Sequence, residues 1–391
     1  MRMGLRKKQK GAVAIMVALC MVFLLGIAAL AIDIGNLLVA RNELQNAADA
    51  AAMAGAGCLY RRTECNNTTV TEPDWTDSET TASNFATTNS SIVTSSKPTP
   101  TNLVQGAVVN VVSTASGYWN VTGSPSGLQN PGITPGVNDM PAVQVTVVKD
   151  PSNANGGIPT YLAGVIGVNV MKAAATATAV VSRPGYVGPH GLFPMAMPLC
   201  MYQQFWSTVN NAPILYPNGP TLDSTQKETQ TNGQPYVFDM GSTYHVTSTC
   251  DAGQWTSFNL ATNGCSSSQS DSCIDGMITT GNAAPLSIGD STWIKSGTAN
   301  NLFNDTNACS AAGNHGCEWE IVPVVDSVAT SGTGAYHTIL AFACLHILKA
   351  GNGSTPYVTV QMSADQSKCT TANSGGTGPN YGAITPPRLV Q

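Results

Sequence analysis

The chain has 391 residues and a formal net charge of −5, and only 10% of its residues are charged, whereas folded soluble domains average about 25%. An acidic chain with so few charges has no basic stripe to attract a phosphate backbone, which excludes a nucleic-acid binder. The hydrophobic fraction of 42% is enough for one or two cores, so the whole chain is not disordered. Eleven cysteines favour an exported protein, because disulfides persist outside the cytoplasm.

Residues 1–11 form a basic segment, and residues 12–32 form an unbroken apolar run. At about 1.5 Å per residue the run spans about 31 Å, the thickness of the hydrocarbon core of a bilayer. The basic segment then stays in the cytoplasm, and the chain after Asp33 lies on the other side. A cleaved secretory signal is the alternative, but its apolar region is about 7–15 residues long. We therefore predict a retained transmembrane helix in contact with membrane lipid.

The helical pattern continues beyond Asp33 as far as Gly55 and Gly57, so a continuous helix over residues 12–57 would be about 69 Å long. Its outer half has a face of small and apolar residues at helical spacing. This face either packs on the domain of its own chain or contacts neighbouring helices in an assembly. In the second case the predicted partner-contact stripe is Leu37, Leu44, Ala48 and Ala51.

The same residues carry a family resemblance. The sequence Gly11-Ala12-Val13-Ala14-Ile15 opens the apolar run, Asp33-x-Gly35 follows it, and Leu44-Gln45-Asn46-Ala47-Ala48-Asp49-Ala50-Ala51 comes next. This segment, residues 8–57, resembles the start of the Tad (Flp) pilus-assembly family, the TadE/TadG-like group, and the remainder is more loosely TadG-like. The resemblance implies a single-pass protein of the bacterial inner membrane that belongs to an adhesive pilus machine.

A processing site is a further expectation from this resemblance. Type IV prepilins are cut after a Gly that follows basic residues, and the bond between Gly11 and Ala12 lies at that place. Those substrates usually carry Glu at the fifth position after the cut, where this chain has Met16. Gly11 then either marks the cleavage site or simply the start of the membrane helix.

Residues 33–182 are predicted to form a pilin-like α+β domain, in which the long helix covers an antiparallel sheet. A short helix is expected near residues 80–88, and strands at 104–113, 118–122, 143–147 and 173–179. Val143, Val145 and Val147 alternate with polar residues, which is the period of a half-buried strand. Residues 183–391 are predicted to form a β-rich extracytoplasmic domain, with one possible edge strand in the last 20 residues.

Cys20 lies in the apolar run, and the other ten cysteines lie outside it. An even number in an exported segment predicts a disulfide framework. Proximity in sequence favours the pairs Cys58–Cys65 and Cys309–Cys317. A metal site that uses Cys309, His315 and Cys317 is the alternative, but no C-x-x-C pair is present.

The sequence contains neither a G-x-S-x-G nucleophile elbow nor an H-E-x-x-H zinc motif. We therefore expect no enzyme, no catalytic residues, no cofactor and no metal. The predicted function is a non-enzymatic pilus-assembly component whose partners are other pilus-assembly or pilin-like proteins, with a homo-oligomer possible. The alternative is a membrane-tethered surface protein whose β domain binds an extracellular ligand such as carbohydrate. Its candidate platform is a set of exposed aromatics, Trp206, Trp255, Trp293 and Trp319, although burial in a core is the commoner state of tryptophan.

Overall fold

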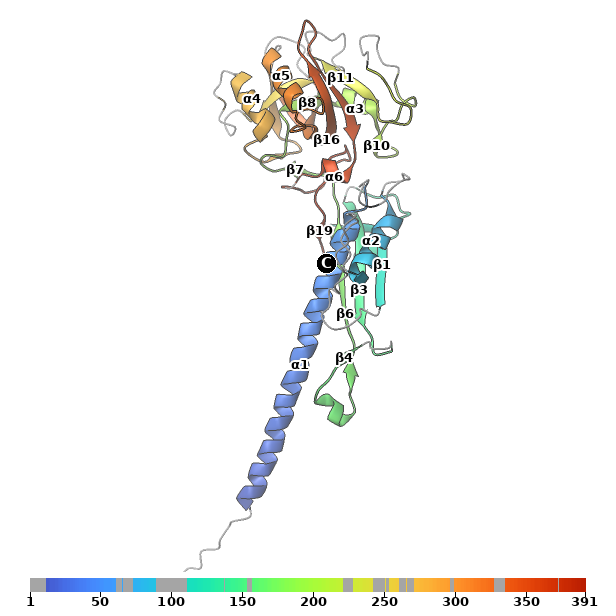
Figure 1. Ribbon diagram of the computed structural model, residues 1–391, viewed down its shortest axis with the longest axis vertical. Helices are drawn as coiled ribbons and strands as arrows, with labels where there is room; N and C mark the ends of the chain where they lie inside the picture. The colour runs from blue at the N-terminus through green and yellow to red at the C-terminus, as the bar shows by residue number, and fades with distance from the viewer. Residues whose placement is uncertain are drawn as a thin grey trace, which may run out of the picture.

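The computed structural model describes residues 12–60, 65, 73–88, 111–136, 138–152, 157–220, 228–241, 250, 253–259, 265, 271–295, 299–326, 335–371 and 373–391. A long helix forms one end of an elongated molecule and leads into a small α+β unit, beyond which lies a larger β-rich unit (Figure 1). The α+β class predicted from the sequence is confirmed.

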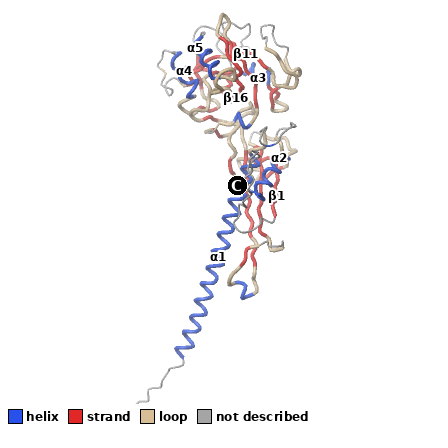
Figure 2. The backbone as a smooth tube through the Cα atoms, in the orientation of Figure 1, coloured by secondary structure: helices blue, strands red, loops and turns tan. Residues whose placement is uncertain are grey.

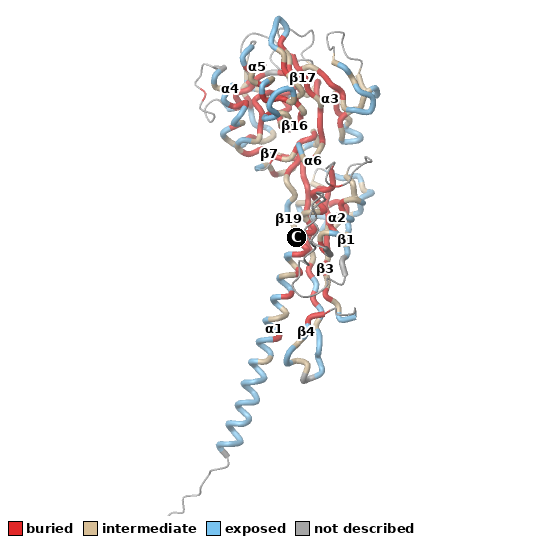
Figure 3. Tube along the Cα trace, viewed as in Figure 1, coloured by how far each residue is buried: buried red, intermediate tan, exposed pale blue. Residues whose placement is uncertain are grey.

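Helix α1 (Ala12–Ala56) is continuous over 45 residues. Its sequence is rich in Ala and Leu and contains no proline, which suits an uninterrupted helix. The first part is exposed all round, whereas the last part is buried in the small unit (Figure 3). The N-terminal part of α1 is therefore an isolated rod, and its C-terminal part is one layer of a folded core.

The small unit has a five-stranded antiparallel sheet in the order β19-β6-β3-β1-β2. Its strands are β1 (Val111–Asn120), β2 (Leu128–Gln129), β3 (Asp139–Lys149), β6 (Ala173–Val180) and β19 (Arg388–Leu389). The C-terminal half of α1 and α2 (Trp75–Thr88) share one core with this sheet. The strand predicted at 118–122 is wrong as a separate element, because β1 runs continuously through Tyr118 to Asn120 against β3. Residues 104–110 lie outside the described residues.

A short hairpin extends from the end of this sheet beside α1, on the side of the rod (Figure 1). It consists of β4 (Ile158–Pro159), the 3-10 helix η2 (Ala163–Ile166) and β5 (Val170–Met171). We call residues 157–172 the tip hairpin.

The larger unit is built on a seven-stranded sheet in the order β11-β17-β16-β14-β12-β8-β15. Its strands and helices lie at the end of the molecule away from the start of α1 (Figure 2). Its strands are β8 (Met195–Pro198), β11 (Val237–Gly241), β12 (Gln254–Phe258), β14 (Ser291–Ile294), β15 (Trp319–Val325), β16 (Ala335–Gly351) and β17 (Tyr357–Ser363). The long strand β16 pairs with both β14 and β15, so part of the sheet closes into a ring.

Smaller elements surround this ring. They are β7 (Tyr186–Val187), α3 (Leu199–Phe205), β9 (Trp206–Ser207), β10 (Ala212–Pro213), α4 (Asp271–Thr280), β13 (Leu286–Ser287), α5 (Asn300–Cys309), α6 (Gln366–Cys369) and β18 (Ser374–Gly375). One large hydrophobic core cluster runs through the described part of the unit, beside a small one formed by Ala196, Ile294 and Val325, so the unit is a second folded body with its own interior.

Two stretches of chain connect the units. The chain leaves the small unit after β6 and returns before β19, and the stretches meet where Thr385 N donates to Ser182 O at 2.9 Å. Beyond this point Arg388 pairs with Val180 and Leu389 with Ala179. The C-terminal residues thus complete the sheet of the first unit, although the sequence boundary at 182/183 assigned them to the second.

Candidate functional site

The exposed part of α1 is the most apolar surface of the described chain. The large side chains between Val13 and Ile32 are each more than half exposed. The best 18-residue window has a mean hydropathy of 2.9, and none of it is buried. The helix is therefore long and apolar enough to cross a membrane once. Ala12 is its first residue, whereas Gly11, the other half of the predicted processing site, lies outside the described residues.

The predicted partner-contact stripe lies inside the small unit. Leu44, Ala48 and Ala51 are fully buried, and Leu37 is partly buried against the same core. They pack with the valines of β3 and the alanines of β6. The small side chains of Ala48 and Ala51 let the helix backbone approach the sheet closely, so the face serves packing within the chain. The stripe interpretation is corrected on this point, because these three buried side chains offer no surface to a partner.

Gly55 explains why helix α2 can cross α1 closely. A Cβ atom at this position would lie 2.8 Å from the Cβ of Ala82 and 3.0 Å from a methyl carbon of Val143. By contrast, a Cβ at Gly35 would meet nothing within 4 Å. Gly55 is thus required for packing, whereas Gly35 is not.

Asp33 joins the rod to the tip hairpin. Its carboxylate accepts backbone N–H bonds from Tyr161 at 2.7 Å and from Ala163 at 2.6 Å, together with a longer one from Leu162 at 3.2 Å. The side chain is only 3% exposed. One helical turn later, Asn36 donates to the carbonyl oxygen of Pro159 at 2.9 Å. Both polar side chains of this stretch of α1 therefore bind the hairpin backbone, a role that sequence reasoning missed.

The ten cysteines outside the apolar run form five disulfides: Cys58–Cys65, Cys200–Cys250, Cys265–Cys273, Cys309–Cys317 and Cys344–Cys369. The pairs favoured by proximity are among them, and Cys20 is free and exposed. Since Cys309 and Cys317 are bonded to each other, neither is available as a thiolate ligand. His315 and His346 instead contact the Glu318 carboxylate, each at 2.9 Å. These contacts hold the pKa of Glu318 below its usual range, although desolvation opposes them.

The proposed tryptophan platform does not exist as a surface. Trp206 and Trp255 are 2% and 4% exposed and belong to the core of the larger unit. Trp293 and Trp319 are partly buried, and the ring of Trp319 stacks on that of His346. These residues therefore stabilise the fold, and the platform prediction is corrected.

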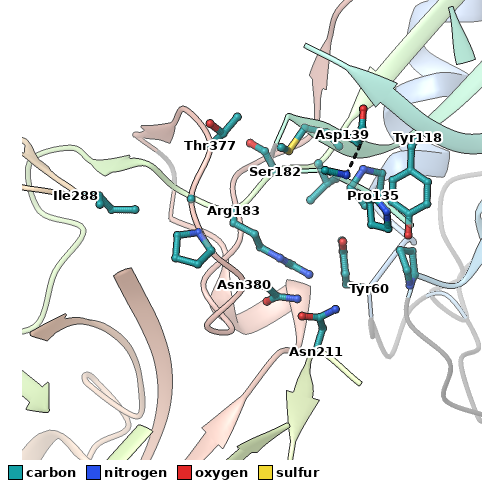
Figure 4. A pocket seen from close by; sticks show the side chains of 17 residues that line it. Tyr60, Tyr118, Pro135, Asp139, Ser182, Arg183, Asn211, Ile288, Thr377 and Asn380 are labelled. Atoms are coloured by element: carbon teal, nitrogen blue, oxygen red, sulfur yellow. Dashed lines mark hydrogen bonds between the residues drawn. The ribbon is translucent and has the colours of Figure 1, made fainter. Parts of the chain in front are cut away.

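A cavity of about 560 Å³ lies where the two units meet. Figure 4 shows residues of both units around it, with Arg183 between Tyr60 on one side and Asn380 on the other. The guanidinium carbon of Arg183 lies 3.9 Å from the ring centroid of Tyr60, and its Nη1 atom is buried without a hydrogen-bond partner among the residues that the structure describes. At the rim, a backbone N–H from Gly136 holds the pKa of Asp139 below its usual range.

Together these features define a class of protein, in which a helix long and apolar enough to span a membrane continues into an α+β unit that carries a second β unit with internal disulfides. Residues 11–57 match the family described as putative Flp pilus-assembly TadE/G-like, and residues 54–179 match the one described as putative Tad-like Flp pilus-assembly. The resemblance to the Tad pilus-assembly families is thereby confirmed for residues 11–179. No significant match was found among curated proteins or solved structures.

Proposed function

We propose that the protein is a non-enzymatic, single-pass component of a Tad/Flp-type pilus assembly machine in the bacterial inner membrane. The observation that carries the proposal is that the stretch matched by the families coincides with one structural unit. The family matches cover residues 11–179, and these residues hold the membrane helix together with most of the sheet on which it packs. The anchor and the pilus-related unit are thus one continuous structure.

The orientation follows from charge and redox chemistry. The basic residues before α1 favour a cytoplasmic N-terminus. Five disulfides in the remainder require an oxidising compartment, which is the periplasm or the cell exterior. A reporter enzyme that is active only outside the cytoplasm, fused after Gln391, tests this orientation. An inactive fusion that is present in the membrane would contradict it.

Partner contact is proposed for the exposed rod of α1, because the small-residue stripe is buried. A rod with apolar side chains on every side can pack against lipid, against other pilin-like helices or against a second copy of the chain. The β unit, held away from the rod, then projects into the periplasm (Figure 1).

The experiment is deletion of the gene, complementation with the full chain, and imaging of pili. Loss of pili and their recovery on complementation is the expected result. A photo-crosslinking residue at Val22 should capture another pilus protein, whereas the same residue at Val209, 89% exposed on the larger unit, serves as the matched control. Normal piliation of the deletion strain would refute the proposal.

The ligand-binding alternative is favoured by one observation, the cavity at Arg183. A buried guanidinium group with a free N–H would bind a carboxylate, including that of an acidic sugar. Thermal shift with a panel of acidic sugars, comparing the chain with an Arg183→Met variant, tests this function. An equal response in both proteins would exclude the cavity as the binding site.

A further inference from the structure

The tip hairpin lies at the level where α1 leaves its apolar run. Between Lys10 and Arg41 the chain carries one charged side chain, that of Asp33, and this carboxylate is bound by the hairpin backbone. Residues 13–40 of the helix are about 42 Å long, which matches a bilayer together with its headgroup layers. Asp33 and the hairpin that binds it therefore fall within the interfacial layer on the far side of the membrane.

The hairpin contains an apolar stretch, which the exposed polar side chains of Asn169 and Lys172 follow. Its residues 161–168 have the sequence Tyr-Leu-Ala-Gly-Val-Ile-Gly-Val, without a charged or amide side chain. Exposed fractions are 68% for Tyr161, 38% for Leu162, 44% for Val168 and 44% for Val170. A cluster of exposed apolar side chains indicates an interaction surface. Tyrosine, with an apolar ring and a polar end, is typical of the membrane interface.

Several backbone groups of the hairpin are hydrogen-bonded within the protein, which suits an environment with little water. Three of its amides bind Asp33. Two more bind within the turn, since Gly167 N donates to Gly164 O at 3.1 Å and Val168 N to Ala163 O at 3.0 Å. The hydroxyl of Thr160 donates to Val168 O. Satisfying backbone groups internally is the condition for irregular chain to enter a low-dielectric layer.

The opposite side of α1 supports the same placement. Ile34, Leu38 and Val39 are 46%, 54% and 58% exposed, although they lie beyond the 12–32 run. The helix thus stays apolar toward the outside over the stretch that the hairpin covers on its other side. Figure 1 shows the hairpin reaching along α1 toward the N-terminal end of the rod.

From these observations we infer that the tip hairpin inserts into the lipid interface from which α1 emerges, so that the small unit has two points of membrane contact. The exposed apolar side chains of the hairpin then lie at the boundary between the lipid headgroups and the acyl chains. The inference rests on the membrane anchoring in the proposed function. Asp33 links α1 to the tip hairpin, because its buried carboxylate takes the place of water as the hydrogen-bond acceptor for the hairpin amides.

The test uses the full chain in liposomes, with an environment-sensitive fluorophore on a single cysteine. Val168→Cys in a Cys20→Ala background reports on the hairpin, and Val209→Cys in the same background is the aqueous control. The native Cys20 reports on the membrane span itself. The expected result is that lipid-borne nitroxides quench the Val168→Cys and Cys20 probes several-fold more than the Val209→Cys probe, with shallow nitroxides most effective for Val168→Cys.

The outcomes separate the possible failures. Quenching of the Cys20 probe without quenching of the Val168→Cys probe would overturn the inference and leave the membrane anchor intact. A Val168→Cys probe that is shielded from aqueous iodide but not quenched by lipid nitroxides would show a protein partner on the tip, and would also overturn it. Absence of quenching at Cys20 would overturn the anchor and the inference together. Val168 is exposed, so its substitution leaves the fold intact, and Tyr161→Cys provides a second, independent probe.

Discussion

Removing the carboxylate of Asp33 should release the tip hairpin from α1. Two of its hydrogen bonds are short, at 2.7 Å from Tyr161 N and 2.6 Å from Ala163 N. A hydrogen bond to a charged group contributes about 1.5–3 kcal/mol. Asp33→Ala therefore removes about 3–6 kcal/mol from the free energy of local opening, which is a factor of roughly 10² to 10⁴ in the opening equilibrium.

Hydrogen exchange of the backbone amides at residues 161–163, measured by mass spectrometry in micelles, reads this equilibrium directly. Asp33→Asn keeps one acceptor oxygen and should give an intermediate increase in exchange rate. Asn36→Ala is the matched control on the same hairpin, because it removes one exposed, neutral bond of 2.9 Å, worth about 0.5–1.5 kcal/mol. Equal exchange rates in Asp33→Ala and Asn36→Ala would refute the assignment of Asp33 as the group that holds the hairpin.

Three further predictions concern stability in micelles. Gly55→Ala should lower the free energy of unfolding by about 1–3 kcal/mol through overpacking. Gly35→Ala places its methyl group in open space and should raise the stability of the helix slightly. Thermal unfolding compares the two variants, and equal effects would contradict the packing role of Gly55. Glu320 is half-buried on β15, and the loss of hydration there raises the pKa of its carboxyl to about 8. The folded state therefore holds a proton that the unfolded chain releases above about pH 4.5. Unfolding free energy should then fall as pH rises from about 4.5 to 8, by a few kcal/mol, and Glu320→Gln should flatten that part of the profile; a wild-type profile flat over this range would contradict it. Replacing Cys200 and Cys250 by Ser opens a loop of 50 residues and should cost about 4 kcal/mol by chain entropy, measured by urea unfolding; a variant as stable as the parent would show that the disulfide does not restrain the unfolded chain.

The hydropathy and periodicity of short stretches were sufficient to predict the helices and strands that these local patterns determine. The length and hydropathy of the first apolar run predict the rod of α1, and the period-two pattern at Val143, Val145 and Val147 predicts the inner face of β3. Periodicity also identified the small-residue face of the helix. It could not decide what covers that face, because a sheet and a partner helix require the same spacing of small side chains.

Contacts between distant residues were beyond prediction from one sequence. The bond from Asp33 to Tyr161 joins residues 128 positions apart, and neither residue alone has a pattern that announces the other. A carboxylate at the end of a long apolar run is nevertheless a signal, since a charge there needs partners. The disulfide Cys200–Cys250 was hidden for a related reason, because ten thiols allow roughly 900 pairings and proximity favours only the short loops.

The neighbouring positions of β6 and β19 have a mechanical consequence. These strands are antiparallel partners, and the whole of the larger unit is an insertion between them in the chain. Both of its attachments therefore leave the small unit at one place, where Ser182 and Thr385 are hydrogen-bonded. Tension along the rod would load α1 and the sheet it packs on, while the larger unit would stay outside the line of force. A turn that joins β6 to β19 would preserve that line if it kept Val181 and Ile384, which are buried in the core of the small unit.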